Sequence, residues 1–111
     1  MADAPVEALR LRIIIGSDDV DGSRPLAEAI VFKAREARLA GATAYRGVTG
    51  FGLSAHVHEP GLLISHDAPV VIEIVDTREK INAFLPELDG MLGSGLVTVE
   101  PVTVVRGGPK G

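Results

Sequence analysis

The alternation of hydrophobic and polar positions predicts a strand and then a helix in the first third of the chain. Over Leu9–Gly16, apolar and basic residues alternate before the run becomes fully apolar, which is typical of a strand. Over Pro25–Ala40, apolar residues recur three and four positions apart, after a proline that suits the first turn of a helix. Gly41 is expected to end this helix, because glycine adopts the left-handed cap conformation without strain.

Two further strands are expected in the middle of the chain, on either side of a long irregular segment. Thr43–Thr49 has the threonine, tyrosine and valine content of a strand. Val70–Val75 is apolar enough for a central strand that is covered on both faces. The segment between them, Gly50–Ala68, holds all three histidines. A loop of this length in a compact domain is usually functional, so we expect a binding segment here.

The last third of the chain predicts a second helix and a final strand. Asp76 is expected to be the N-cap of the helix, with Glu79 at its third position. Apolar residues follow at helical spacing, and Pro86 inside this stretch should bend the helix. The final strand is expected over Leu96–Val105, with a break at Pro101 that suits an edge strand or a bulge.

This order of elements, β-α-β-β-α-β, predicts an α+β fold of the ferredoxin-like type. Right-handed crossovers convert the order into one four-stranded antiparallel sheet with two helices on one face. We expect a flexible N-terminal arm over residues 1–8, a single domain over 9–106 and a flexible tail over 107–111. The length of 111 residues and the 46% hydrophobic share fit one domain of this kind.

The apolar content of the strands predicts self-association. Two helices cover only one face of the sheet, yet Val70, Ile72 and Ile74 alternate with Val71 and Val75, and the last strand carries further valines. Monomeric proteins rarely expose a large apolar face. We therefore expect a homo-oligomer that is packed through the face without helices.

Composition excludes several classes of function. The net charge is −4, with 11 basic against 15 acidic residues, which does not suit binding to nucleic acid. The absence of cysteine excludes disulfides, thiolate metal sites and a cysteine nucleophile. The apolar runs are far shorter than the roughly 20 residues that span a bilayer, and Met1–Ala8 lacks an apolar signal core. We expect a cytoplasmic protein without membrane insertion.

Two glycine-rich motifs are candidate anion sites. The first, Arg46-Gly47-Val48-Thr49-Gly50-Phe51-Gly52, places three glycines near a strand end, where backbone N–H groups can approach an anion closely. Its structural alternative is a strand that leaves the sheet through a strained turn. The second motif, Gly93-Ser94-Gly95, fits either a helix C-cap or a second phosphate-binding turn.

The histidines suggest a different chemistry. If the chain is extended at His56-x-His58, both imidazoles point to one face and can bind a divalent metal. Glu59, His66, Asp67 or another subunit would then complete the ligand set. The alternative is that these are ordinary solvated loop histidines.

The sequence offers little for catalysis. Ser65-His66-Asp67 are sequence neighbours, which is not how a catalytic triad is assembled, and there is no nucleophile elbow. Glu73 lies in an apolar strand, so its carboxyl either has a pKa raised by burial or faces solvent or a subunit contact. We expect no enzymatic activity.

The combined motifs resemble a family of uncharacterised PII-like proteins, which is related to the PII nitrogen-signalling proteins. The resemblance covers about Leu9–Val105, nearly the whole chain. The PII proteins are trimers of ferredoxin-like subunits that bind adenine nucleotides between subunits and contact partners through a long loop. The segments that carry the resemblance are Arg12–Gly16, Pro25–Ile30, Gly41–Gly52, His58, Pro69–Asp76, Phe84–Pro86 and Gly95–Thr98.

This resemblance implies a non-enzymatic signalling homotrimer without a cofactor, which binds an adenine nucleotide or a similar anion in clefts between subunits. Residues 51–68, with Ser54, His56 and His58, would contact an unidentified protein partner. The alternative is a trimer that responds to divalent metals through His56, His58 and His66, like the copper-tolerance trimers of this fold. Two positions differ from PII. Leu96 stands where PII has a phosphate-binding lysine, and of the basic pair on the PII C-terminal segment only Arg106 is present nearby. The implied ligand-binding residues are Arg46, Gly47, Gly50, Phe51, Gly52, Gly93, Ser94, Gly95 and Arg106.

Overall fold

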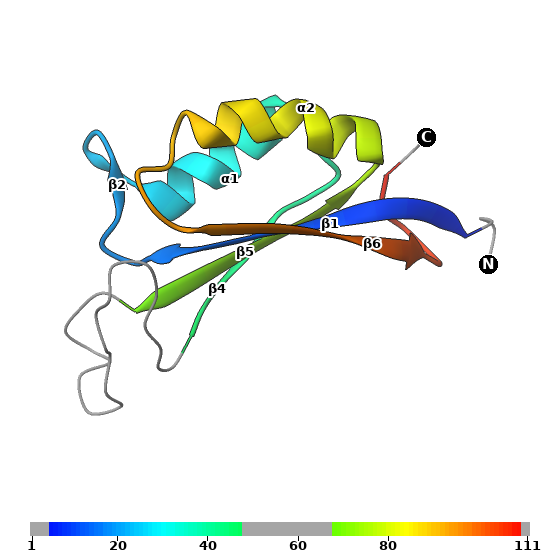
Figure 1. Ribbon diagram of the computed structural model, residues 1–111, viewed down its shortest axis with the longest axis horizontal. Coiled ribbons are helices and arrows are strands. Elements are labelled where there is room, and N and C mark those ends of the chain that lie inside the picture. Colours follow the sequence, from blue (N-terminus) through cyan, green and yellow to red (C-terminus); the bar gives the residue numbers. More distant parts are fainter. Residues whose placement is uncertain (1–4, 48–67, 110–111) are drawn as a thin grey trace.

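Two helices lie on one face of a four-stranded antiparallel sheet whose strand order is β4-β5-β1-β6 (Figure 1). This computed structural model describes residues 5–47 and 68–109. The arrangement confirms the predicted ferredoxin-like α+β fold. A short hairpin, β2 and β3, adds a second sheet between β1 and α1. The elements are β1 (Val6–Gly16), β2 (Val20–Asp21), β3 (Arg24–Pro25), α1 (Leu26–Glu36), β4 (Thr43–Arg46), β5 (Pro69–Asp76), α2 (Arg78–Asp89) and β6 (Leu96–Val104).

The core lies between the sheet and the helices. In the central strands β1 and β5, side chains alternate between two faces, and every second one is buried against α1 and α2. Each helix contributes the apolar stripe that its sequence spacing predicts. The largest fully buried apolar side chains are Phe84, Leu11, Ile13, Ile30, Ile72, Ile74, Ile81 and Leu88.

The strands β1 and β6 differ from the prediction in their extent and regularity. β1 begins at Val6, so it includes residues that the sequence placed in a flexible arm, and Val6–Ala8 pair with the end of β6. β6 runs through Pro101 without a bulge, and Pro101 pairs with Leu9 in an unbroken register. The predicted break is therefore wrong, whereas the predicted edge position is confirmed. An outer strand tolerates proline because one side of its backbone has no partner strand.

Helix α1 ends earlier than predicted, and its cap is not Gly41. The helix ends at Glu36, and Arg38 takes the left-handed conformation with φ of 61°. The N–H of Arg38 donates to the carbonyl of Arg35 at 3.0 Å, and that of Leu39 donates to Ala34 at 3.1 Å. These two bonds form a Schellman cap. Leu39 packs against the core, which explains why the chain turns here.

The N-cap of α2 is Thr77, one residue after the predicted Asp76. The hydroxyl of Thr77 accepts a hydrogen bond from the Lys80 N–H at 3.2 Å. Asp76 is fully buried instead, and its carboxylate accepts hydrogen bonds from the N–H groups of Ala40 and Thr77, both at 2.7 Å. It therefore links the end of β5 to the connection between α1 and β4.

The face of the sheet without helices, hereafter the open face, is less apolar than the sequence suggested. Val97 and Val99 share the side of the buried Leu11 and Ile13, so they are not on the open face. Apolar residues lie at both ends of the open face, and charged residues lie in the rows between them. The row at the loop end consists of Tyr45, Val71, Ile14 and Leu96, the pairs Ala8–Val102 and Val6–Val104 lie at the other end, and the charged residues between them are Arg10, Arg12, Glu73 and Glu100.

Candidate functional site

One end of the sheet gathers several of the residues that the sequence assigned to a ligand. β4 ends at Arg46, β5 begins at Pro69, β1 ends at Gly16 and β6 begins at Leu96, and the strand registers place all four at the same end. We call this the loop end of the sheet. β1 begins and β6 ends at the opposite end (Figure 1). The antiparallel topology therefore brings the start of the first glycine motif and the whole of the second to one end of the molecule.

The chain is held firmly on both sides of residues 48–67. The N–H of Gly47 donates to the carbonyl of Pro69 at 2.7 Å, and a Cβ on Gly47 would lie 2.7 Å from Pro69 Cγ. Ser17 and Ala68 exchange two hydrogen bonds: the Ser17 N–H donates to the Ala68 carbonyl at 2.8 Å, and the Ala68 N–H donates to Ser17 Oγ at 2.9 Å. The chain thus leaves and re-enters the sheet at neighbouring anchored positions.

The turn at residues 93–95 packs directly on the end of β1. Gly95 has a φ of +130°, and a Cβ there would lie 3.0 Å from the Ile14 carbonyl oxygen and 3.2 Å from Ile15 Cγ2. Only glycine fits this position without strain. Gly93 and Ser94 are exposed, and no backbone group of the described chain accepts a hydrogen bond from their N–H groups. Exposed backbone N–H groups of this kind are suited to an anion.

The described start of the first glycine motif, Arg46 and Gly47, lies at the opposite edge of the sheet from the second motif. β4 and β6 are the outer strands, with β5 and β1 between them. Three strand spacings separate them, which amounts to about 14 Å. A single phosphate group therefore does not reach Gly47 and Gly95 of the same subunit.

Arg106 lies away from both motifs within one chain. It follows β6, whose nine residues run from the loop end to the far end of the sheet. At roughly 3.3 Å per residue, that strand carries the chain about 30 Å from Gly95. The sequence-predicted ligand set is thus divided, with Arg46, Gly47 and residues 93–95 at the loop end and Arg106 at the other.

Seven of the predicted site residues lie outside the described residues: Gly50, Phe51, Gly52, Ser54, His56, His58 and His66. Within residues 5–47 and 68–109, no group of three His, Asp or Glu side chains is arranged to hold a metal ion. In that same part of the chain, no helix is long and apolar enough to cross a membrane.

Asp19, in a segment that the sequence indicates as a turn and a helix entry, helps to build the loop end. Its carboxylate accepts a hydrogen bond from the Gly16 N–H at 2.9 Å, and its carbonyl accepts one from the Leu26 N–H at 2.8 Å. Asp19 therefore holds the end of β1 and the start of α1 together. A serine and two aspartates directly after a buried strand were the available signal, because such residues favour turns that use side-chain hydrogen bonds.

Glu73 lies in a polar network on the open face. Its Oε2 accepts hydrogen bonds from Arg12 Nε at 2.9 Å and from the Tyr45 hydroxyl at 3.1 Å, and lies 2.8 Å from Arg12 Nη2. The Arg12 guanidinium holds the pKa of Glu73 below its ordinary value, against the opposite effect of desolvation. The predicted alternative of a raised pKa is therefore wrong. Beside this network, Arg10 pairs with Glu100, with Arg10 Nε 2.9 Å from the carboxylate.

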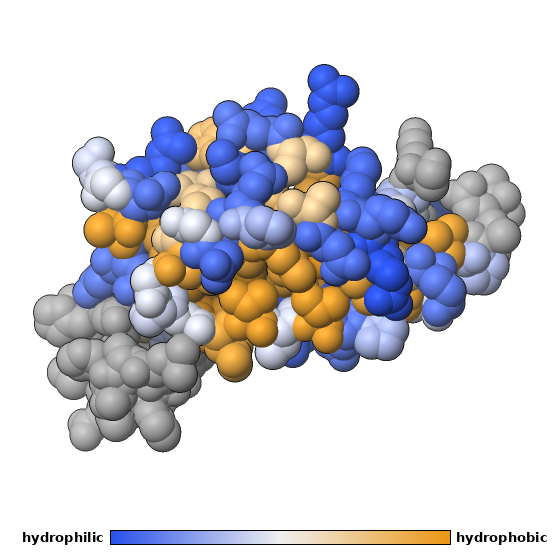
Figure 2. Space-filling view, turned by 45° about the horizontal axis from the view of Figure 1, so that its top comes forward, coloured by the Kyte–Doolittle hydropathy of each residue, from blue (hydrophilic) through white to orange (hydrophobic). Residues whose placement is uncertain are grey.

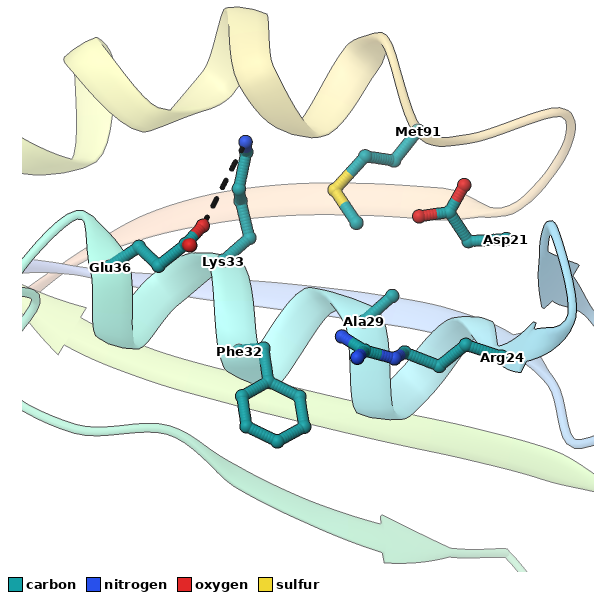
Figure 3. A pocket seen from close by; sticks show the side chains of 7 residues that line it. All are labelled: Asp21, Arg24, Ala29, Phe32, Lys33, Glu36 and Met91. Atoms are coloured by element: carbon teal, nitrogen blue, oxygen red, sulfur yellow. Dashed lines mark ion pairs between the residues drawn. The ribbon is translucent and has the colours of Figure 1, made fainter.

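A separate groove of about 360 Å³ lies between the β2–β3 hairpin, α1 and the chain after α2 (Figure 3). Its cationic side chains already have partners. The Arg24 guanidinium lies 4.7 Å from the centre of the Phe32 ring, and Lys33 Nζ lies 4.0 Å from Glu36 and 3.9 Å from Glu87. The groove contains none of the predicted ligand residues. It is lined by Asp21, Arg24, Ala29, Phe32, Lys33, Glu36 and Met91.

The fold of the chain is PII-like. The structure is similar to CPII from Thiomonas intermedia K12, a nitrogen regulatory PII-like protein bound to ADP, AMP and bicarbonate, with a TM-score of 0.64, 21% identity and 92% of each chain covered. It is also similar to a PII-like signaling protein from Thermus thermophilus, with a TM-score of 0.64, 18% identity, and 94% of this chain and 95% of that chain covered. CutA1 from Oryza sativa has a TM-score of 0.53 at 16% identity, over 92% of this chain and 84% of that chain. At these identities the likeness concerns the fold.

The chain belongs to the family DUF190, Uncharacterized ACR, which it matches over residues 8–104. A UPF0166 protein of Aquifex aeolicus (strain VF5) is 35% identical over 96 residues, which are 86% of this chain and 90% of that protein. A second UPF0166 protein of the same organism is 35% identical over 78 residues, 69% of this chain and 81% of its own length. The predicted resemblance to an uncharacterised PII-like family is thereby confirmed.

Proposed function

We propose that this protein is a non-enzymatic PII-like regulator that forms a homotrimer and binds an adenine nucleotide, or a similar anion, between subunits. The observation that carries the proposal is the placement of Arg46 and Gly47 relative to residues 93–95. These two groups lie at the same end of the sheet but on opposite edges, so a ligand group that touches both requires two copies of the chain.

A ring of identical subunits supplies this geometry. In a closed ring, one edge of each subunit faces the opposite edge of the next. The outer strand β4 of one subunit then faces the outer strand β6 of its neighbour. With all loop ends on one side of the ring, Arg46 and Gly47 of one subunit come beside residues 93–95 of the next. With all loop ends on one side, Arg106 lies at the other end of the sheet in every subunit, so we do not assign it to this ligand.

The chemistry of the loop end suits phosphate. Gly93 and Ser94 offer exposed N–H groups, Ser94 adds a hydroxyl, and the exposed Arg46 supplies a positive charge. Leu96 contributes no charge at the start of β6, so Arg46 is the cation that we assign to the phosphate. The binding of ADP and AMP by the PII-like protein of Thiomonas intermedia is consistent with the same use of the fold here.

We further assign residues 51–68 to contact with a protein partner in the cytoplasm. The support is the firm attachment on either side of this segment, where Gly47 is bonded to Pro69 and Ser17 to Ala68. A segment with anchored ends can change its contacts without disturbing the sheet. A ligand at Arg46 and Gly47 lies close in sequence to its first residue and is well placed to influence it.

Isothermal titration with ATP, ADP, AMP and cyclic AMP tests the nucleotide proposal. We expect heat of binding with at least one of them, and a loss of affinity of about tenfold or more in Arg46→Ala, because a charge-assisted contact with phosphate is removed. Arg35→Ala is the matched control, since Arg35 is exposed on α1, away from the loop end. Absence of heat and of thermal stabilisation with all four nucleotides would refute the proposal.

A further inference from the structure

The groove of about 360 Å³ beside α1 is large enough for a small molecule, and its ends differ from its middle (Figure 3). Asp21 lies at the end formed by the β2–β3 hairpin, and Glu36 lies at the other end, where α1 ends. The uncharged Ala29 and Met91 lie between them. The groove thus has a carboxylate at each end and apolar side chains between the two.

Asp21 is a charge of the groove that has no counter-charge. The hairpin places it opposite Arg24 in the strand register, and the turn between them contains Gly22 with φ of 64°. The Arg24 guanidinium nevertheless points to Phe32 rather than to Asp21, and lies 4.0 Å from Glu28 (Figure 3). Within the described part of the chain, the Asp21 carboxylate has no hydrogen bond or ion pair. A cation that enters here meets a carboxylate that no side chain neutralises.

The Glu36 end of the groove also has an excess of negative charge. Lys33 Nζ lies 4.0 Å from Glu36 and 3.9 Å from Glu87 of α2, so one cation is shared by two carboxylates. The other cation that lines the groove, Arg24, is balanced by Glu28. The side chains in and around the groove therefore leave one unbalanced negative charge at each end.

These two excess charges are well separated. Ala29 and Glu36 are seven residues apart on α1, which is about 10 Å at a rise of roughly 1.5 Å per residue. Asp21 lies on the opposite side of Ala29 from Glu36 (Figure 3). A ligand that neutralises both ends therefore needs two cationic groups at about this distance or more. The apolar middle favours methylene groups as the link between them.

We propose that this groove binds a linear aliphatic diamine or polyamine, with one terminal ammonium group on Asp21 and the other on Glu36. Such amines are protonated at neutral pH, as the lysine side chain is. The excess of negative charge disfavours an anion. A stable protein partner needs a much larger contact surface, and the helix layer around the groove is largely hydrophilic, with hydrophobic residues gathered below it (Figure 2). The groove shares no residue with the proposed nucleotide site.

Isothermal titration of the full chain with diaminooctane, at neutral pH and low salt, tests the proposal. We expect heat of binding, and a loss of affinity of about fivefold in Asp21→Asn, as for an exposed charge pair. Glu79→Gln is the matched control, because it removes one exposed negative charge from the first turn of α2, at the opposite end of that helix from Met91. This control should bind as the wild type does. Far-ultraviolet circular dichroism verifies that the variants are folded.

Two related amines test whether both ends of the groove take part. Diaminobutane has the charge of diaminooctane but is too short to reach from Asp21 to Glu36, and aminooctane has the same chain with a single ammonium group. Both should bind the wild type about fivefold more weakly than diaminooctane. Glu36→Gln should lower the affinity for diaminooctane to that for aminooctane.

Each contrary result overturns a stated part of the proposal. Absence of heat with diaminooctane overturns the site. An equal loss of affinity in Asp21→Asn and Glu79→Gln means that the amine is attracted only by the net charge of −4, which also overturns it. Equal affinity for diaminooctane and diaminobutane overturns the role of Glu36. Titration of Asp21→Asn with ADP should match the wild type, so a failure here leaves the nucleotide proposal intact.

Discussion

Replacing Gly95 by alanine should destabilise the protein and displace the turn that we assign to the ligand. Gly95 has a φ of +130°, which is a conformation that residues with a Cβ rarely adopt, and the new Cβ would lie 3.0 Å from the Ile14 carbonyl oxygen. Backbone strain of this kind costs about 1–3 kcal/mol. Because the close neighbour is a backbone atom of a central strand, the turn has to move rather than β1. We expect a loss of about 2 kcal/mol in the free energy of unfolding.

Urea denaturation followed by circular dichroism measures this loss. Gly41→Ala is the control, because a Cβ on Gly41 meets no atom within 4 Å and its φ lies outside the left-handed region. That control should keep or slightly raise the stability, since alanine reduces the freedom of the unfolded chain. Equal stability of Gly95→Ala and wild type would contradict the description of this turn as a position that requires glycine.

Four further outcomes are expected. Asp76→Ala should lower the free energy of unfolding by about 2 kcal/mol in urea denaturation, because two backbone N–H groups lose a buried acceptor; an unchanged midpoint would contradict this. Arg38→Gly should raise the melting temperature by a few degrees, since glycine relieves the left-handed strain, and a lower one would disprove it. Because the pKa of Glu73 is lowered in the folded state, its ion pair stabilises the fold at pH values above the ordinary carboxyl pKa. This stabilisation is lost as the pH falls through the lowered pKa, so the unfolding free energy of Glu73→Gln should depend less on pH in the acid range. If the protein responds to metals, the thermal shift caused by zinc or copper should vanish in His56→Ala with His58→Ala, and persistence of the shift excludes these ligands.

The periodicity of the sequence was sufficient to predict the order and type of the main helices and strands. The alternation in β1 and the apolar run of β5 reflect faces that the fold indeed buries. The ends of the helices were less predictable, because they depend on tertiary contacts. Arg38 takes the cap conformation that the sequence suggested for Gly41, since the packing of Leu39 against the core decides where the chain turns.

The polarity of the open face could be predicted only with the strand register, which the periodicity of the sequence does not provide. Arg12 and Glu73 are 61 residues apart, and only the pairing of β1 with β5 places them opposite each other. Without that pairing, Glu73 is indistinguishable from an isolated carboxyl in an apolar strand. The register makes it one half of an ion pair with Arg12, which lowers its pKa and excludes the alternative of a pKa raised by burial.

The candidate site was predictable in its parts but not in its arrangement. The glycine motifs stand out in the sequence, but their spacing also fits a strained strand end and a helix C-cap. The placement of Gly47 and of residues 93–95 on opposite edges, and the position of Arg106 at the far end, follow from the antiparallel topology. This topology is the reason to look for the ligand between subunits rather than within one.

A complementation experiment tests the shared site most directly. Arg46→Ala and Gly95→Ala each damage one half of the proposed site, so each variant alone should bind nucleotide poorly. When the two variants are unfolded together and refolded as a mixture, mixed rings should contain intact sites formed by Arg46 of one variant and the turn of the other. We predict that titration of the mixture recovers about a quarter of the sites, because each half has an even chance of being intact. If the mixture binds no more nucleotide than the separate variants do, this result would contradict a site shared between subunits.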